Sequence, residues 1–227
     1  MSSQPAADPA SPTFAAVLFD LDGTLIDSTP AVVRSWVAWA VEYGIDPLAL
    51  QGFHGVPARS IVARFVSADQ VPDALARVTE LEVGDVSDIV LLPGAAAALA
   101  ALAAVPNAIA TSCTRELADA RLAASGLVRP DVVVTADDVE HGKPAPDPFL
   151  LAARRLGVDP ADCLVVEDAP SGLTAARAAG CATLAVTTTS AAADLTADHV
   201  VPDLSQVRFS VVDGRVRLEV LAQAVAD

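Results

Sequence analysis

Asp20 and Asp22 come directly after the apolar run 15–19, and this placement makes them the first candidates for chemistry in the chain. A β-strand points residues i and i+2 to the same side, so both carboxylates would lie together at the end of a buried strand. Like charges in such a place repel each other and are costly to bury without a partner. A bound cation relieves the repulsion, and carboxylate oxygens suit Mg²⁺. The alternative interpretation is a plain surface turn, since Asp22-Gly23 is a common turn pair.

Further polar groups follow later apolar runs and include hydroxyls, an ammonium and a second acidic pair. They are Thr111-Ser112, Lys143 and Glu167-Asp168. Open parallel sheets bind ligands beyond the carboxyl ends of their strands, so all these groups are expected at one edge of a sheet. Lys143 is notable because it is the only lysine in the chain. Each group also has an ordinary explanation, as a helix cap, an exposed lysine or an acidic pair favoured at a helix N-terminus.

The pattern along the chain predicts the elements that must position these groups. Strand-like apolar runs lie at 17–19, 108–110, 132–134, 164–166 and 183–186. From Pro93 onward such runs alternate with helical segments, which indicates a parallel sheet covered by helices. Between residues 30 and 90 the patterns are helical, and they lie at about 31–43, 57–66 and 72–90. The first of these helices would have Pro30 in its first turn and Ser28 or Thr29 as its cap.

The predicted fold is therefore α/β, with a Rossmann-like parallel sheet and a small α-helical region inserted after the first strand. We expect a disordered tail at 1–12, a core formed by 13–28 and 92–227, and a helical cap at 29–91. Hinges between core and cap are expected near 28–30 and 91–94. Near the C-terminus, apolar runs at 207–212 and 216–220 flank an Asp-Gly pair, which predicts a β-hairpin.

The composition of the chain argues against some classes of binding partner. The chain has 227 residues and a formal net charge of −15, which argues against binding to nucleic acid or to anionic membranes. A small phosphorylated metabolite stays compatible, because a metal and local cations dominate a small pocket. Neither a membrane span nor a secretory signal is recognisable, so we expect a cytoplasmic protein, and nothing indicates more than a monomer. The three cysteines lack metal-site spacing and are expected to be buried thiols.

Four stretches together resemble the motifs of the haloacid dehalogenase-like (HAD) hydrolase superfamily. They are 19–25 (FDLDGTL), Thr111-Ser112, 142–144 (GKP) and 166–172 (VEDAPSG). The helical insert is similar to the cap of the subgroup that contains small sugar-phosphate phosphatases and a phosphomutase. Short strings at 53–55, 110–115 and 136–139 look most like those of glycerol-phosphate and 2-deoxyglucose-6-phosphate phosphatases. The resemblance implies a HAD-type core with a helical cap.

The resemblance also implies catalytic roles. Asp20 would be the nucleophile that forms an aspartyl-phosphate, and Asp22 would act as general acid and then as general base. Lys143 would neutralise phosphate charge and orient the nucleophile. Thr111 or Ser112 would donate a hydrogen bond to a phosphate oxygen, and the run TSCT leaves both open, with a slight preference for Ser112.

The implied cofactor is Mg²⁺. Its ligands would be the carboxylate of Asp20, the backbone carbonyl of Asp22 and Asp168, while Glu167 would act through a water or from a supporting position.

Substrate-binding residues are expected in the cap and beside the motifs. The candidates are Arg59, His54, Gly55, Thr24 and Arg115. The guanidinium of Arg59 would suit sugar hydroxyls or a second anionic group.

The resulting hypothesis is a phosphoric monoester hydrolase, namely a Mg²⁺-dependent phosphatase of small sugar or polyol phosphates. The main alternative is a sugar phosphomutase similar to β-phosphoglucomutase, in which the phosphoryl group passes to another sugar hydroxyl instead of to water. A non-catalytic regulator on the same fold is a third hypothesis, and the presence of Asp20 and Lys143 argues against it. A dehalogenase would share the nucleophile but would not need the metal that Glu167-Asp168 suggest.

Overall fold

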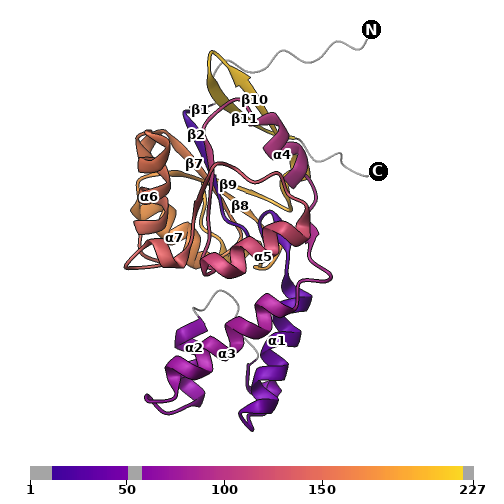
Figure 1. The fold of residues 1–227 in the computed structure, drawn as a ribbon. Coiled ribbons are helices and arrows are strands. Elements are labelled where there is room, and N and C mark those ends of the chain that lie inside the picture. The colour runs from indigo at the N-terminus through magenta and orange to yellow at the C-terminus, as the bar shows by residue number, and fades with distance from the viewer. Residues whose placement is uncertain (1–11, 51–57, 222–227) are drawn as a thin grey trace.

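A six-stranded parallel sheet forms the centre of the computed structural model, which describes residues 12–50 and 58–221 (Figure 1). Its strand order is β6-β5-β2-β7-β8-β9. The strands are β2 (Ala16–Phe19), β5 (Asn107–Ala110), β6 (Val132–Val134), β7 (Cys163–Glu167), β8 (Ala182–Val186) and β9 (His199–Val201). The predicted α/β fold is therefore confirmed, and each apolar run expected in the core sheet is a strand. Strand β9 was not predicted because it begins with a histidine and only its last residue is buried, so it lacks a continuous apolar run.

Helices cover both faces of the sheet (Figure 1). They are α4 (Ala95–Ala101) and α5 (Arg115–Ser125) on one face, and α6 (Asp147–Leu156) and α7 (Pro170–Ala178) on the other. Alternate residues of the central strand pack on opposite faces of the sheet. Val17 and Phe19 belong to the apolar cluster on the side of α4 and α5, and Ala16 and Leu18 belong to the cluster on the side of α6 and α7. This alternation follows from the two-residue period of a strand. All four of these residues are fully buried, so strand β2 is held rigidly from both sides.

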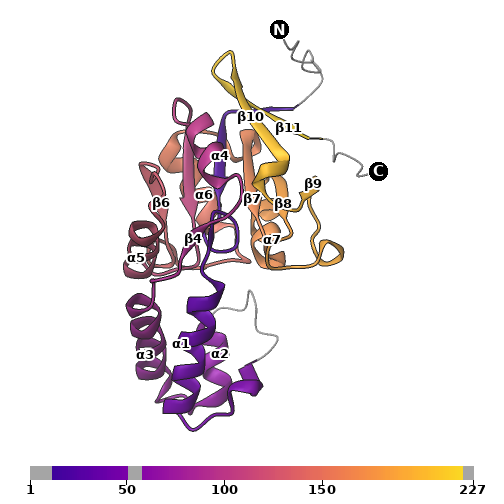
Figure 2. The same ribbon diagram turned by 90° about the vertical axis from the view of Figure 1, so that its right-hand side faces the viewer.

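A separate group of helices lies below the sheet in Figure 2. It consists of α1 (Thr29–Glu42), the 3-10 turn η1 (Pro47–Leu50), α2 (Ala58–Phe65) and α3 (Val71–Gly84). These helices share an apolar cluster of their own, centred on the fully buried Trp39. The indole N–H of Trp39 donates to the carbonyl of Ala74 at 2.9 Å, which fixes α1 against α3. In the described ranges, no helix combines the length and the apolar character that a membrane crossing requires.

The third predicted helix is wrong at its C-terminal end. Helix α3 stops at Gly84, and Asp85 has a non-helical conformation instead of the expected helical one. Glycine and aspartate are both weak helix formers, which explains the early end. Beyond it, β4 (Val90–Leu91) pairs antiparallel with β3 (Ile26–Asp27). The chain therefore enters and leaves the helical region through two neighbouring strands.

The C-terminal hairpin is confirmed and has a structural role. Strands β10 (Val207–Val212) and β11 (Arg215–Val220) pair antiparallel, and β11 also pairs with β1 (Thr13–Phe14). Phe209 of the hairpin meets Phe19 of the central strand edge to face, with ring centroids 6.3 Å apart. The hairpin therefore closes the apolar core on the α4 side of the sheet. The remaining elements are the 3-10 turns η2 (Ala136–Asp138), η3 (Pro160–Asp162), η4 (Ala192–Asp194) and η5 (Leu204–Gln206).

Candidate active site

The polar groups singled out in the sequence converge at the carboxyl edge of the sheet. Asp20 follows β2, Thr111 follows β5, and Glu167 is the last residue of β7. Strand β2 pairs with both β5 and β7, so these three residues end neighbouring strands. The backbone N–H of Asp20 donates to the carbonyl of Val166 at 2.9 Å, which extends the pairing to the nucleophile candidate itself.

Three carboxylates and one ammonium form the buried centre of this edge. One ligand oxygen from each of Asp20, Glu167 and Asp168 lies within 4.8 Å of the others. The Nζ of Lys143 lies 2.5 Å from Asp20 Oδ1 and 2.7 Å from Glu167 Oε1. With all four groups ionised, the cluster carries an excess of two negative charges, which a divalent cation would balance. The donor set is made of oxygens, as Mg²⁺ requires, so the residues present fit that ion.

The electrostatics of the cluster favour the binding of a cation. Burial raises the pKa of Asp20 above its usual range against the opposing charge of Lys143, and the charges of Glu167 and Asp168 raise it further. Burial and the Glu167 charge likewise raise the pKa of Asp168 to about 7. Burial alone would lower the pKa of Lys143, but Asp20 and Glu167 outweigh this and raise it, so the ammonium stays charged. Each carboxylate is therefore easier to ionise when a cation is present.

Glu167 accepts three hydrogen bonds from within the protein. It therefore supports the cluster and is less available to a ligand. Its Oε2 accepts the backbone N–H groups of Asp168 and Ala169, both at 2.8 Å, while Oε1 accepts Lys143. Gly172 allows this close packing, because a Cβ at that position would lie 1.7 Å from Glu167 Oε1. Glu167 thus has fewer free lone pairs than Asp20 and Asp168.

Asp168 is oriented by two threonine hydroxyls. Thr24 Oγ1 donates to Asp168 Oδ1 at 3.2 Å, and Thr189 Oγ1 donates to Oδ2. Gly23 has a φ of +82°, and a Cβ there would lie 2.3 Å from Asp168 Oδ2. Gly23 therefore supplies both the expected sharp turn and the space for the neighbouring carboxylate. The sequence analysis missed Thr189, although it stands just after β8 at the same edge of the sheet.

The carboxylate of Asp22 lies outside the acidic cluster and is held by three donors. Its Oδ1 accepts Ser28 Oγ at 2.6 Å and Arg121 Nη1 at 2.8 Å, and its Oδ2 accepts the thiol of Cys113 at 2.9 Å. Ser28 is the N-cap residue of α1, as predicted, but its side chain makes no hydrogen bond to the first turn of that helix. Its hydroxyl binds Asp22 instead.

The cysteines are buried and free, as predicted. Burial and the nearby charge of Asp22 raise the pKa of the Cys113 thiol well above its usual value. Cys113 is therefore a hydrogen-bond donor here and not a thiolate nucleophile.

A cleft of about 1520 Å³ joins this edge to the helical region. Asp20, Lys143, Thr111 and Ser112 line it from the sheet side, and Arg59 of α2 lines it from the helices. Thr111 is buried and its Oγ1 accepts the N–H of Cys113, whereas Ser112 is exposed.

A model of haloacid dehalogenase-like hydrolases matches residues 14–180. The chain belongs to the haloacid dehalogenase-like hydrolase family. Hexitol phosphatase A of Escherichia coli is 45% identical to it over 175 residues, which are 74% of this chain and 81% of that protein. Glycerol-1-phosphate phosphohydrolase 2 of Saccharomyces cerevisiae is 35% identical over 189 residues, which are 77% of this chain and 75% of that protein.

Solved structures agree with the assignment. A hydrolase from Pseudomonas syringae has a TM-score of 0.74 at 28% sequence identity, with 84% of this chain and 94% of that chain covered. The predicted haloacid dehalogenase-like fold and the predicted enzyme class, a phosphoric monoester hydrolase, are therefore confirmed.

Two substrate-binding candidates lie outside the lining of the hydrolase's cleft. The guanidinium of Arg115 binds Asp138 at 2.5 Å and the carbonyl of Val133 at 3.0 Å, so its charge is used between α5 and β6. Thr24 lies beneath Asp168, as described above. His54 and Gly55 fall outside the described residues, as does the predicted tail except for Pro12.

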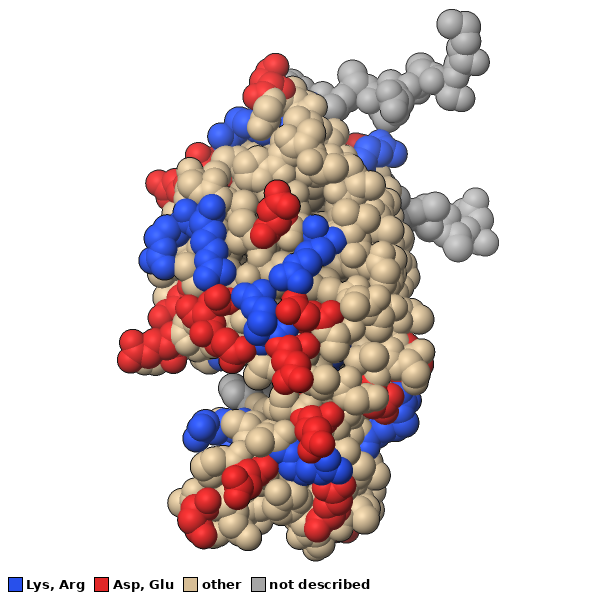
Figure 3. All heavy atoms as spheres, viewed as in Figure 1, with Lys and Arg blue, Asp and Glu red and all other residues tan. Residues whose placement is uncertain are grey.

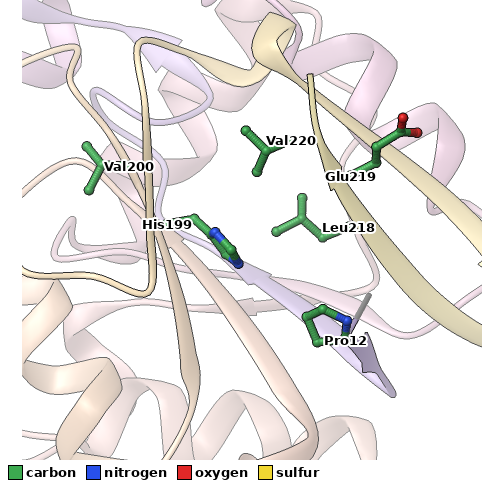
Figure 4. Close-up of a pocket in the computed structure, with 6 residues that line it drawn as sticks. All are labelled: Pro12, His199, Val200, Leu218, Glu219 and Val220. Atoms are coloured by element: carbon green, nitrogen blue, oxygen red, sulfur yellow. The ribbon is translucent and has the colours of Figure 1, made fainter. Parts of the chain in front are cut away.

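The surface of the hydrolase has two further features besides the cleft. A hollow of about 270 Å³ is lined by Pro12, His199, Val200, Leu218, Glu219 and Val220, which Figure 4 shows as sticks. His199 begins β9, so this hollow lies at the amino end of that strand, opposite to the catalytic edge. On the face shown in Figure 3, acidic and basic side chains are interspersed, and many acidic ones lie where the core meets the helical region.

Proposed function

We propose that this hydrolase is a Mg²⁺-dependent phosphatase of small sugar or polyol phosphates. The observation that carries the proposal is the buried cluster in which Lys143 contacts Asp20 and Glu167 beside Asp168, at the floor of a large cleft. Such a cluster offers a nucleophile, a fixed ammonium and a surplus of negative charge for a metal in one place. The names of the relatives, a hexitol phosphatase and a glycerol-1-phosphate phosphohydrolase, support the substrate class.

Asp20 is the proposed nucleophile. One of its oxygens is held by Lys143, which leaves the other free to attack phosphorus. The attack forms an Asp20–phosphorus bond while the ester P–O bond breaks, and the electron pair of that bond leaves with the alcohol oxygen. Water then attacks the aspartyl-phosphate, and inorganic phosphate and the free carboxylate are released.

Asp22 is the proposed general acid and base. It would give a proton to the leaving alkoxide and later take one from the attacking water. Its position two residues after the nucleophile, on the turn opened by Gly23, supports this role. Asp22 lines the cleft, so its carboxylate is accessible to a substrate bound there.

The phosphate would be bound by Lys143 and a hydroxyl of the β5 end. Thr111 is the better candidate, because its oxygen already accepts the N–H of Cys113 and its hydroxyl hydrogen is free to donate. The exposed Ser112, which the sequence analysis preferred slightly, would have to order its side chain for the same contact.

Asp20, Asp168 and the backbone carbonyl of Asp22 are the proposed ligands of Mg²⁺, with Glu167 in support. When bound, the ion would neutralise charge on the phosphate oxygens and hold the nucleophile ionised. We propose that the helical region 29–91 acts as a cap above the core formed by 13–28 and 92–227. In this arrangement Arg59 faces the cleft and would bind substrate hydroxyls or a second anionic group.

The test is phosphate release from a panel of phosphate esters in Mg²⁺ and in EDTA. The panel contains glycerol phosphates, hexitol phosphates, hexose 6-phosphates and 2-deoxyglucose 6-phosphate. We expect release that requires Mg²⁺ and favours a few of these esters, and we expect Asp20→Asn to lower kcat by at least about 1000-fold. Metal-independent release, or near-normal activity of Asp20→Asn, would overturn the proposal. Conversion of β-glucose 1-phosphate to the 6-phosphate that depends on a bisphosphate primer would identify the mutase instead.

A further inference from the structure

The guanidinium of Arg121 is buried between the core and the helical region. Its side chain is only 5% exposed, and it projects from α5 beside Leu117, Ala118 and Leu122, which are also buried. A buried charge is costly unless it is paired, so its partners decide what such a residue does. Apolar packing alone would favour a leucine at this position of the helix.

The partners of Arg121 belong to the site and to the cap. Nη1 lies 2.8 Å from Asp22 Oδ1 and 3.2 Å from the sulfur of Cys113. Nη2 lies 3.2 Å from Oε1 of Glu82, which is carried by α3. The Nε–H has no hydrogen-bond partner among the described residues. One cation thus binds a carboxylate of the catalytic motif and a carboxylate of the helical region at the same time.

Without these contacts, Asp22 would be poorly fixed. It sits on a turn, its side chain is 25% exposed, and it lies outside the cluster formed by Lys143. General acid catalysis needs the proton donor within hydrogen-bond reach of the leaving oxygen, and small displacements are expensive. Arg121 is the one charged donor to Asp22 in the part of the chain that the structure describes.

Because Glu82 also binds Arg121, the contact between Arg121 and Asp22 depends on the position of helix α3. Its side chain is 11% exposed, and burial raises its pKa while the charge of Arg121 opposes the effect. Two carboxylates on different structural units share one guanidinium, so displacement of α3 changes how strongly Arg121 holds Asp22. The position of the cap therefore affects how firmly Asp22 is held.

We propose that Arg121 is a positioning residue for Asp22, and that Glu82 couples this positioning to helix α3. The inference rests on the proposed function, because it takes Asp22 as the proton donor to the leaving alcohol. The competing explanation is that Arg121 only neutralises Glu82 and stabilises the fold. The two explanations differ in what happens to substrates that need protonation of the leaving group.

The test compares an alkyl phosphate with an aryl phosphate, p-nitrophenyl phosphate, whose leaving group hardly needs a proton. We expect Arg121→Met to lower kcat/KM for the alkyl phosphate by about 100-fold and for the aryl phosphate by less than about 10-fold, with KM nearly unchanged. Arg121→Lys should recover part of the activity, because a single ammonium restores the charge but cannot bridge both carboxylates as the fork does. Arg129→Met is the matched control, since Arg129 pairs with Asp119 of α5 on the exposed side.

A double variant, Arg121→Met with Glu82→Gln, separates positioning from folding. It removes the charge that Arg121→Met leaves buried, so we expect it to fold as stably as the protein itself yet to keep the selective loss with the alkyl phosphate. Recovery of alkyl phosphate hydrolysis in the double variant, or an equal loss with both esters, would overturn the inference. Failure of the proposed function would be seen separately, as absence of Mg²⁺-dependent release by the unmodified protein.

Discussion

At the scale of single residues, the candidate metal site depends on side chains that would not themselves touch the ion. Thr24 and Thr189 each donate a hydrogen bond to one oxygen of Asp168, and Gly23 leaves room for that carboxylate. Asp20 is held from the other side by Lys143. The two proposed carboxylate ligands are therefore oriented before any cation arrives, which lowers the cost of binding it.

Replacement of Thr189 by valine tests this orientation. Valine keeps the shape but removes the hydroxyl, so Asp168 loses one donor and gains freedom to rotate. We expect the affinity for Mg²⁺ to fall by about 10- to 100-fold, which is typical for loss of such an outer contact. The measurement is the Mg²⁺ concentration that gives half-maximal phosphate release. Thr174→Val is the control, because Thr174 binds only the carbonyl of Pro170 on an exposed part of α7, and equal behaviour of the two variants would contradict the expectation.

At the scale of elements, Asp138 connects three parts of the core. It accepts hydrogen bonds from Arg155 of α6 at 2.8 Å, from Arg115 of α5 at 2.5 Å, and from the backbone N–H of Thr135 after β6 at 2.8 Å. Burial alone would raise the pKa of Asp138, but the hydrogen bonds from Arg155 and Thr135 outweigh it and hold the pKa well below its usual range. The folded protein therefore favours the ionised carboxylate.

This shift predicts how stability depends on pH. A lowered pKa in the folded state stabilises the protein at any pH above the ordinary aspartate value of about 4, and the contribution fades as the pH falls below that value. We expect Asp138→Asn to lower the free energy of unfolding by about 1–2 kcal/mol at pH 7, because the partly exposed arginines weaken the pair. The difference should shrink at pH 3 in denaturant titrations. Asp119→Asn, at an exposed pair, is the control, and an undiminished difference at pH 3 would count against the argument.

Some of the secondary-structure elements could be predicted from the sequence, and others could not. Long apolar runs such as 164–166 predicted their strands, since burial on both faces leaves a continuous apolar signal. Two-residue strands such as Val90–Leu91 carry no such signal, so the predicted helix runs to Val90 and the predicted hinge begins at Leu91. Asp20, Lys143 and Asp168 follow recognisable apolar runs and could be predicted at the site, whereas Thr189 in the hydroxyl run after β8 was not predicted.

Arg121 was missed for a different reason. Its contacts with Asp22 and Glu82 join residues far apart in the chain, and no local pattern reports such a contact. The available signal was an arginine in register with the apolar residues Leu117 and Leu122 of one helix, where a charge is unexpected.

At the scale of the whole molecule, the net charge of −15 and the uncompensated acidic cluster predict that Mg²⁺ stabilises the fold. A ligand at 100 times its Kd stabilises the folded state by about 2.7 kcal/mol. For a chain of this size we expect the melting temperature to rise by roughly 5–10 °C in saturating Mg²⁺. Sodium chloride at equal ionic strength controls for general screening. Asp168→Asn should abolish most of the shift, and a shift that survives this substitution would mean that the ion binds elsewhere.

The pairing of β3 with β4 has a consequence for exchange of modules between proteins. Asp27 and Val90 are direct partners, so the chain departs for the helical region and returns from it at points only one strand spacing apart, about 4.8 Å. A helical unit from another protein, with ends at that spacing, could be inserted between Asp27 and Val90 without changing the strand pairing. The edge that carries Asp20 would then face a different helical unit, and under the proposed function this would change the choice of substrate while the chemistry at the edge stays the same. Among the described residues, the contact between Glu82 and Arg121 is the ion pair that such a graft would also have to replace with a carboxylate of its own.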